Sequence, residues 1–280
     1  MRKQCMCAFF LFSGMLGKGQ NSSFKSHKKG EVYIAWGWNV DAFTKSNISF
    51  KGADYNFKLY KVTAHDRPTK PINYSNYLKS DKITVPQTNF RIGYFIKDNV
   101  SVTVGVDHMK YVMDQNQTVT MKGTINRDGF YKGNYNGTQV LTTDFLTFEH
   151  TDGLNYINLE AEKYFNWYHS KDGKLLVTGF AGAGAGVLVP KTNVQLLNYE
   201  RNDRFHLSGF GLGLKGGIEF KFFKHFAIRF ENKYGYINMP DIILHKKGIQ
   251  GKAKQSFFFA QLNGMIGASF NLSKKKKVSE

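Results

Sequence analysis

The sequence predicts an all-β fold: an eight-stranded antiparallel up-and-down transmembrane β-barrel with long extracellular loops. Eight segments alternate apolar and polar residues with a period of two, which is the pattern of strands with two different faces. Short and long connections alternate between these segments, as they do in barrels with turns at one end and loops at the other. Charges of both signs gather on one face of the segments. That face suits a narrow lumen, and the apolar face suits lipid.

The eight predicted strands share this alternation, and they are 31–43, 89–96, 100–111, 155–165, 174–189, 209–222, 226–236 and 256–272. The connections 97–99, 166–173 and 223–225 are short, whereas 44–88, 112–154, 190–206 and 237–255 are long. Both termini of the chain then lie on the short-turn side, which is the periplasmic side in bacterial barrels.

Glycine recurs on one face of the strand 209–222, whose sequence is GFGLGLKGGIEFKF. The interior of an eight-stranded barrel is just wide enough for side chains to fill it. Glycine on the inward face would therefore make room for long charged side chains from neighbouring strands. If 174–189 and 209–222 pair, we expect three glycine pairs across them: Gly182 with Gly213, Gly184 with Gly211, and Gly186 with Gly209.

The polar faces predict a network of paired charges in the lumen. Its members are Glu31, Arg91, Glu160, Glu162, Lys215, Glu219, Arg229, Glu231 and Lys233. A three-residue turn at 223–225 would place Glu219 opposite Arg229. The alternative is a soluble barrel of the lipocalin kind, with an apolar interior and an early Gly37-Trp38 signal. Because the mixed charges lie on one face, they favour the membrane barrel.

The ends of the chain predict export. Residues 1–19 read as a signal peptide, with a basic start, an apolar run from Cys5 to Leu16, and small residues at Gly17 and Gly19. Cys5 and Cys7, the two cysteines of the chain, lie inside it, so the mature protein would have no disulfide. The remaining predicted parts are a periplasmic N-terminal segment (20–30), the outer-membrane barrel (31–272) and a basic periplasmic tail (273–280).

Six stretches carry a resemblance to a known group: AHDRP (64–68), DHMKYVMDQ (107–115), FEHTDGLNYI (148–157), GAGVLVPKT (184–192), RFHLSGFG (204–211) and GYINMPD (235–241). The chain resembles the small eight-stranded outer-membrane barrels of Gram-negative bacteria, and is most similar to a largely uncharacterised group from the Bacteroidetes. The resemblance implies an outer-membrane location and lends no activity, so no functional residue is carried over. Barrels of this type usually end on an aromatic residue, whereas here Phe270 is followed by ten more residues.

Four histidines form the candidate functional site. Each has a carboxylate nearby, and all are expected at the loop-side ends of strands: His65 with Asp66, His108 with Asp107, His150 with Glu149 and Asp152, and His206 near Asp203. A histidine held by a carboxylate is the unit of general-base catalysis and of metal sites. If these side chains converge, they could hold a metal ion or a polarised water. If they do not, each pair anchors its own loop. No catalytic residue, metal or cofactor is assigned.

The composition narrows the function classes. The formal charge is +18, yet no helix or aromatic platform accompanies it, so no nucleic-acid partner is expected. The lysines of the first long loop could neutralise the phosphates of lipopolysaccharide, or could simply keep a long loop solvated. The favoured function is a non-enzymatic barrel that is structural or binds a surface ligand or partner through its loops. The alternative is an outer-leaflet lipid-modifying enzyme (lipid A acyl transfer or hydrolysis) that uses the histidine cluster. Transport ranks third, because a filled interior leaves no pore.

Overall fold

A computed structural model describes residues 25–68, 87–202 and 204–272. The predicted signal peptide, residues 20–24, Asp203, the tail 273–280 and part of the first predicted loop (69–86) lie outside the described residues. In the described part, no helix is long and apolar enough to cross a membrane.

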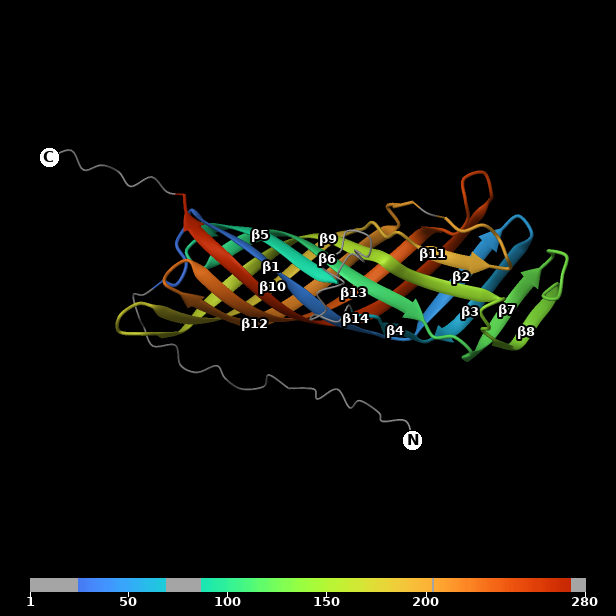
Figure 1. Cartoon of the computed structure of the whole chain (residues 1–280), viewed down its shortest axis with the longest axis horizontal. Helices are drawn as coiled ribbons and strands as arrows, with labels where there is room; N and C mark the ends of the chain where they lie inside the picture. The colour runs from blue at the N-terminus through green and yellow to red at the C-terminus, as the bar shows by residue number, and fades with distance from the viewer. Residues whose placement is uncertain (1–24, 69–86, 203, 273–280) are drawn as a thin grey trace, which may run out of the picture.

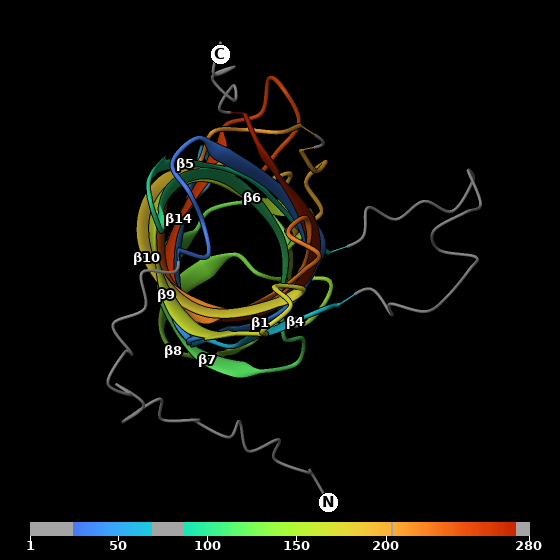
Figure 2. The ribbon, with the colours of Figure 1, turned by 90° about the vertical axis from the view of Figure 1, so that its left-hand side faces the viewer.

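Eight long strands form a closed antiparallel barrel, which Figure 2 shows end on. They are β1 (Glu31–Phe43), β5 (Thr88–Lys97), β6 (Val100–Met113), β9 (Leu146–His169), β10 (Leu175–Leu188), β12 (Gly209–Phe222), β13 (Phe226–Ile243) and β14 (Gly251–Asn271). Each pairs with the next one in this order, and β1 pairs with β14 to close the ring. The predicted fold class and all eight predicted strands are confirmed, with several strands longer than expected.

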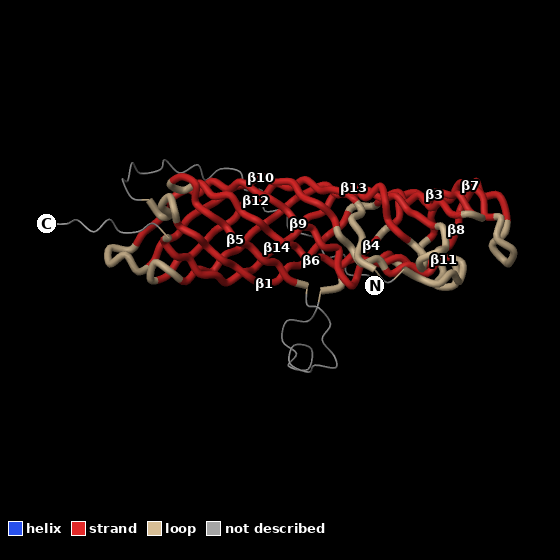
Figure 3. Tube along the Cα trace, turned by 90° about the horizontal axis from the view of Figure 1, so that it is seen from above, coloured by secondary structure: helices blue, strands red, loops and turns tan. Residues whose placement is uncertain are grey.

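The long connections are not simple loops, and the prediction was wrong on this point. They contain six further strands: β2 (Ser46–Gly52), β3 (Tyr55–Val62), β4 (Ala64–Asp66), β7 (Thr118–Ile125), β8 (Gly133–Val140) and β11 (Asn193–Leu196). These continue the wall beyond the ring, in the order β14-β2-β3-β7-β8, with β11 on β9 and β4 on β6. Figures 1 and 3 show this extension at the end away from the short turns. We call these six strands, with the strand ends that pair with them, the cap.

The inward face changes character along single strands. On β13, Arg229, Glu231 and Lys233 point inward and are buried in the barrel, whereas Ile237 and Met239 continue the same face into the cap and are also buried. On β14 the same face changes from Asn263 and Gln261 to Phe259 and Phe257. The molecule therefore has a charged interior in the barrel and an apolar interior in the cap.

The outward face of the barrel carries exposed apolar side chains, which we call the apolar belt. On β13 they include Phe226, Phe230 and Tyr234, which are 45%, 53% and 54% exposed, and on β12 Leu214 is 66% exposed. A membrane-spanning strand needs about 9–11 residues, and β13 presents this face from Phe226 to Tyr236. The belt is long enough to cross a bilayer.

The glycines of β10 and β12 pair in a different register from the one expected. Gly184 lies opposite Gly213 and Gly186 opposite Gly211, but Gly182 lies opposite Lys215. The shift of two residues has a physical reason. On its other side β10 pairs Gly182 with Glu162 and Gly184 with Glu160. In this register the bare glycine face leaves room for Lys215 on β12 to reach both glutamates across β10.

Replacing Gly184 with Ala should destabilise the barrel by roughly 1–3 kcal/mol, the range for overpacking. A Cβ at Gly184 would lie 2.4 Å from the carbonyl oxygen of Leu159 and 2.6 Å from Cγ of Glu160. Gly137→Ala is the matched control, because a Cβ there meets nothing within 4 Å. Urea unfolding in detergent measures both variants, and equal effects would contradict the crowding argument.

Candidate functional site

The rim, where the barrel meets the cap, holds the predicted histidines, but each contacts a separate partner. Nδ1 of His65 lies 2.5 Å from Oδ1 of Asp114, not beside the carboxylate of Asp66. Asp66 instead accepts a hydrogen bond from the backbone N–H of Asp41 at 2.8 Å. Burial raises the pKa of Asp66. Nδ1 of His108 lies 2.7 Å from Oδ1 of Asn155.

The other two histidines are equally local. Nδ1 of His150 lies 2.9 Å from Oγ1 of Thr192, and burial lowers the pKa of His150 to about 4. Nε2 of His206 lies 3.1 Å from Oδ2 of Asp241.

The three remaining carboxylates of the predicted cluster also have their own contacts. Glu149 accepts a hydrogen bond from Asn193 at 2.9 Å, and Asp152 pairs with Lys191 at 3.4 Å. Asp107 does not belong to the rim, because it is buried in the lumen among basic side chains.

Of the two alternatives left open by the sequence, convergence of these side chains is not found. Within 25–68, 87–202 and 204–272, no group of three or more His, Cys, Asp or Glu side chains is placed to hold a metal ion. Apart from Asp107, these residues connect neighbouring segments of the chain where the barrel meets the cap. The lipid-modifying alternative depended on their convergence and loses its main support.

The lumen, in contrast, brings charged side chains together from all around the barrel. Nζ of Lys233 on β13 lies 2.6 Å from Oδ2 of Asp107 on β6 and 2.7 Å from Oε1 of Glu160 on β9. Arg91 on β5 contacts Asp107 at 2.6 Å and Glu231 at 3.3 Å. Because β6 and β13 are opposite each other in the ring, the Lys233–Asp107 pair crosses the whole lumen. Side chains therefore close the barrel at this level.

A second layer of charges lies closer to the short turns. Nζ of Lys215 contacts Glu160 at 2.5 Å and also pairs with Glu162. Arg229 contacts Glu162 at 3.0 Å and donates a hydrogen bond to the hydroxyl of Tyr164 at 2.6 Å. Glu219 lies opposite Arg229 on the neighbouring strand, as expected, with a longer N···O distance of 3.7 Å.

His27 closes the barrel at the end with the short turns, which we call the mouth. Its ring is 2% exposed and stacks on Phe95, with centroids 4.3 Å apart. Nδ1 lies 3.0 Å from Glu31 and Nε2 lies 3.0 Å from Glu219, the second contact being an ion pair rather than a directed hydrogen bond. A neutral imidazole has one N–H, so favourable contact with both carboxylates requires the imidazolium form.

Sequence reasoning placed His27 in a periplasmic segment and gave it no role. The missed signal is a charge imbalance. The lumen network contains the carboxylates of Glu31, Asp107, Glu160, Glu162, Glu219 and Glu231, but the basic side chains of only Arg91, Lys215, Lys221, Arg229 and Lys233. An imidazolium at position 27 balances this network. His27, four residues before β1, is thus part of the barrel interior.

The chain is similar to several solved outer-membrane proteins at low sequence identity. No protein-family model matches the chain, and a search of curated proteins finds no match. Among solved structures, the outer membrane protein OprG from Pseudomonas aeruginosa is 12% identical, with a TM-score of 0.39 over 88% of this chain and 98% of that chain. Neisserial surface protein A is 11% identical, with a TM-score of 0.36 over 86% and 100%. Ail of Yersinia pestis is 13% identical, with a TM-score of 0.30 over 86% and 99%. At these identities, the likeness concerns only the arrangement of strands.

Proposed function

We propose that this chain is a bacterial outer-membrane β-barrel without a transport pore, which presents a rigid cap at the cell surface for binding rather than catalysis. The observation that supports this most strongly is the inversion of polarity along the strands. Where the outward face is apolar the inward face is charged, and where the inward face becomes apolar the strands form the cap. An apolar exterior suits lipid, and an apolar interior suits a structure surrounded by water.

The filled lumen supports a binding role over transport. The Lys233–Asp107 pair crosses the barrel, and His27 occupies its mouth. The cap has an apolar core that includes Phe50, Phe57 and Phe148. A packed core holds surface side chains in fixed positions, which lowers the entropic cost of binding a ligand or partner.

A tag inserted between Asp128 and Gly129 should be labelled by antibody on intact Gram-negative cells. This site lies between β7 and β8, and the side chain of Asp128 is 93% exposed. The matched control is a tag between Asp172 and Gly173, in the turn between β9 and β10, which should be labelled only after permeabilisation. The reverse pattern would overturn the orientation, and recovery of the folded protein outside the membrane fraction would overturn the proposed span.

A further inference from the structure

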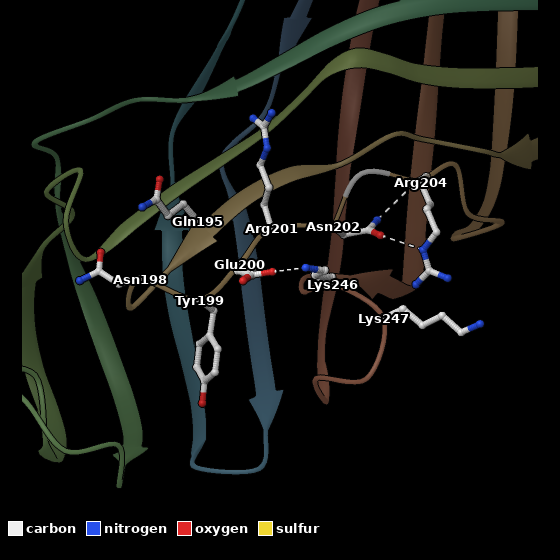
Figure 4. A pocket seen from close by; sticks show the side chains of 9 residues that line it. All are labelled: Gln195, Asn198, Tyr199, Glu200, Arg201, Asn202, Arg204, Lys246 and Lys247. Atoms are coloured by element: carbon white, nitrogen blue, oxygen red, sulfur yellow. Dashed lines mark hydrogen bonds and ion pairs between the residues drawn. The ribbon is translucent and has the colours of Figure 1, made fainter.

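A basic pocket of about 650 Å³ opens on the surface of the cap (Figure 4). Two segments form its walls: residues 198–202 with Arg204, which follow β11, and the connection between β13 and β14, with Lys246 and Lys247. Its lining contains neither the charged side chains of the lumen nor the rim histidines. The pocket is therefore a separate feature of the surface.

Backbone contacts fix the two walls relative to each other. The N–H of Asn202 donates to the carbonyl of Leu244 at 3.1 Å, and the N–H of Lys246 donates to the carbonyl of Glu200 at 3.0 Å. Arg201 and His245 form a β-bridge between these two contacts. The pocket thus has a preformed shape, and a ligand would not have to order its walls.

The described lining is rich in positive charge. Lys246 pairs with Glu200 at 2.7 Å, which leaves Arg201, Arg204 and Lys247 in excess. Asn202, which is 3% exposed, accepts a hydrogen bond from Nε of Arg204 at 3.3 Å and donates one to its carbonyl at 3.1 Å. This contact orients the guanidinium and engages only its Nε. In Figure 4, Arg204 and Lys247 extend to the same side of the pocket.

The side chains indicate the chemistry of the ligand. A guanidinium binds phosphate through two parallel N–H groups, and a neighbouring ammonium adds a mobile point charge. Gln195 and Asn198, also in the lining, can exchange hydrogen bonds with sugar hydroxyls. We propose that this pocket binds the phosphate groups of a phosphorylated saccharide.

The position of the pocket agrees with this ligand. Phe205 and Leu207, each 59% exposed, follow Arg204 directly and lead into the outward face of β12, which belongs to the apolar belt. Exposed apolar side chains thus continue from the belt to the edge of the pocket, which we infer faces the lipid headgroups. This step rests on the proposed membrane span. The phosphorylated saccharide could then belong to the surrounding lipopolysaccharide or to a soluble glycan.

The test uses the folded full chain in neutral detergent, titrated by calorimetry with the phosphorylated oligosaccharide released from deacylated lipopolysaccharide, and with the same oligosaccharide after dephosphorylation. Binding should require the phosphates, and the double change Arg204→Gln with Lys247→Gln should weaken it at least tenfold. The matched control is Lys122→Gln with Lys254→Gln, which removes two exposed cap lysines outside the pocket and should leave affinity unchanged. Arg204→Lys, which retains the charge, should recover part of the binding.

Nanodiscs with and without intact lipopolysaccharide separate the two sources. Binding of the free oligosaccharide in detergent supports a soluble glycan as a sufficient ligand. Phosphate-dependent binding that appears only with intact lipopolysaccharide supports the lipid as the source. Equal binding of the dephosphorylated saccharide, or equal losses in the pocket and control variants, would overturn the site. Because surface labelling at Asp128 is independent of these residues, such a result would leave the proposed membrane span standing.

Discussion

Replacing Arg229 with Met should lower the free energy of unfolding of the barrel by roughly 3–5 kcal/mol, because removing one partner of a buried ion pair leaves the other charge uncompensated. Arg229 is 1% exposed and contacts Glu162 at 3.0 Å. It also donates to the Tyr164 hydroxyl at 2.6 Å and lies 3.9 Å above the ring of Phe180. Met fills part of the volume, so the loss reports mainly on charge and hydrogen bonding.

Double-mutant cycles identify which carboxylate Arg229 depends on. Glu219 lies opposite Arg229 in the sheet, but its N···O distance is 3.7 Å, against 3.0 Å for Glu162 on β9. We expect a larger coupling energy for Arg229→Met with Glu162→Gln than for Arg229→Met with Glu219→Gln. Urea unfolding in detergent gives both values. Strict additivity in both cycles would mean that the lumen charges do not interact.

The barrel itself could be predicted because its signal is local. Each strand alternates with a period of two, and the inward residues of β13 up to Lys233 are charged while its outward residues are apolar. That contrast identifies both the strand and its lipid-facing side without knowledge of any partner. The hairpin register of Glu219 with Arg229 followed from a three-residue turn, which fixes pairing locally. The β10–β12 register spans a long connection, and no local rule fixed it.

The cap was not predicted, because the apolar face of its strands points inward, whereas that of the barrel strands points outward. Ile48 and Phe50 alternate with polar residues on β2, as a strand should, but they lie inside rather than outside. Period-two alternation does not say whether water or lipid surrounds a strand. Charged residues such as Lys51 and Lys58 therefore made the first long connection resemble a solvated loop.

The candidate site could not be predicted for a related reason. Carboxylates adjacent in sequence to the histidines point to opposite faces of the strand, since neighbouring residues alternate. The true partners come from other segments: Asp114 for His65, 49 residues away, and Asp241 for His206, 35 residues away. The crossing of the lumen by Lys233 and Asp107 likewise depends on closure of the ring, which brings together residues 126 positions apart.

Lowering the pH from 7 to below 4 should destabilise the cap, because the buried imidazole of His150 must then be protonated. Burial lowers the pKa of His150 to about 4, and its ring lies between Tyr111 and Phe148, 5.7 and 5.1 Å away. In the unfolded chain the pKa of a histidine is about 6.5. Between these values the unfolded state binds more protons, so stability falls as the pH drops through 6.5 and levels off below 4. The full difference corresponds to about 3 kcal/mol.

Hydrogen exchange measured from pH 7 to 4 should therefore show cap strands β2, β3 and β7 losing protection as the pH falls. His245, whose pKa burial also lowers to about 4, adds to the effect from the β13–β14 connection. His150→Phe, which removes the titrating group from a site already walled by aromatic rings, should reduce the acid sensitivity of the cap. His65→Gln is the control, because His65 is exposed at the surface of β4 and has no buried ring to protonate. If His150→Phe and His65→Gln respond to acid in the same way, the buried imidazole is not the group that weakens the cap.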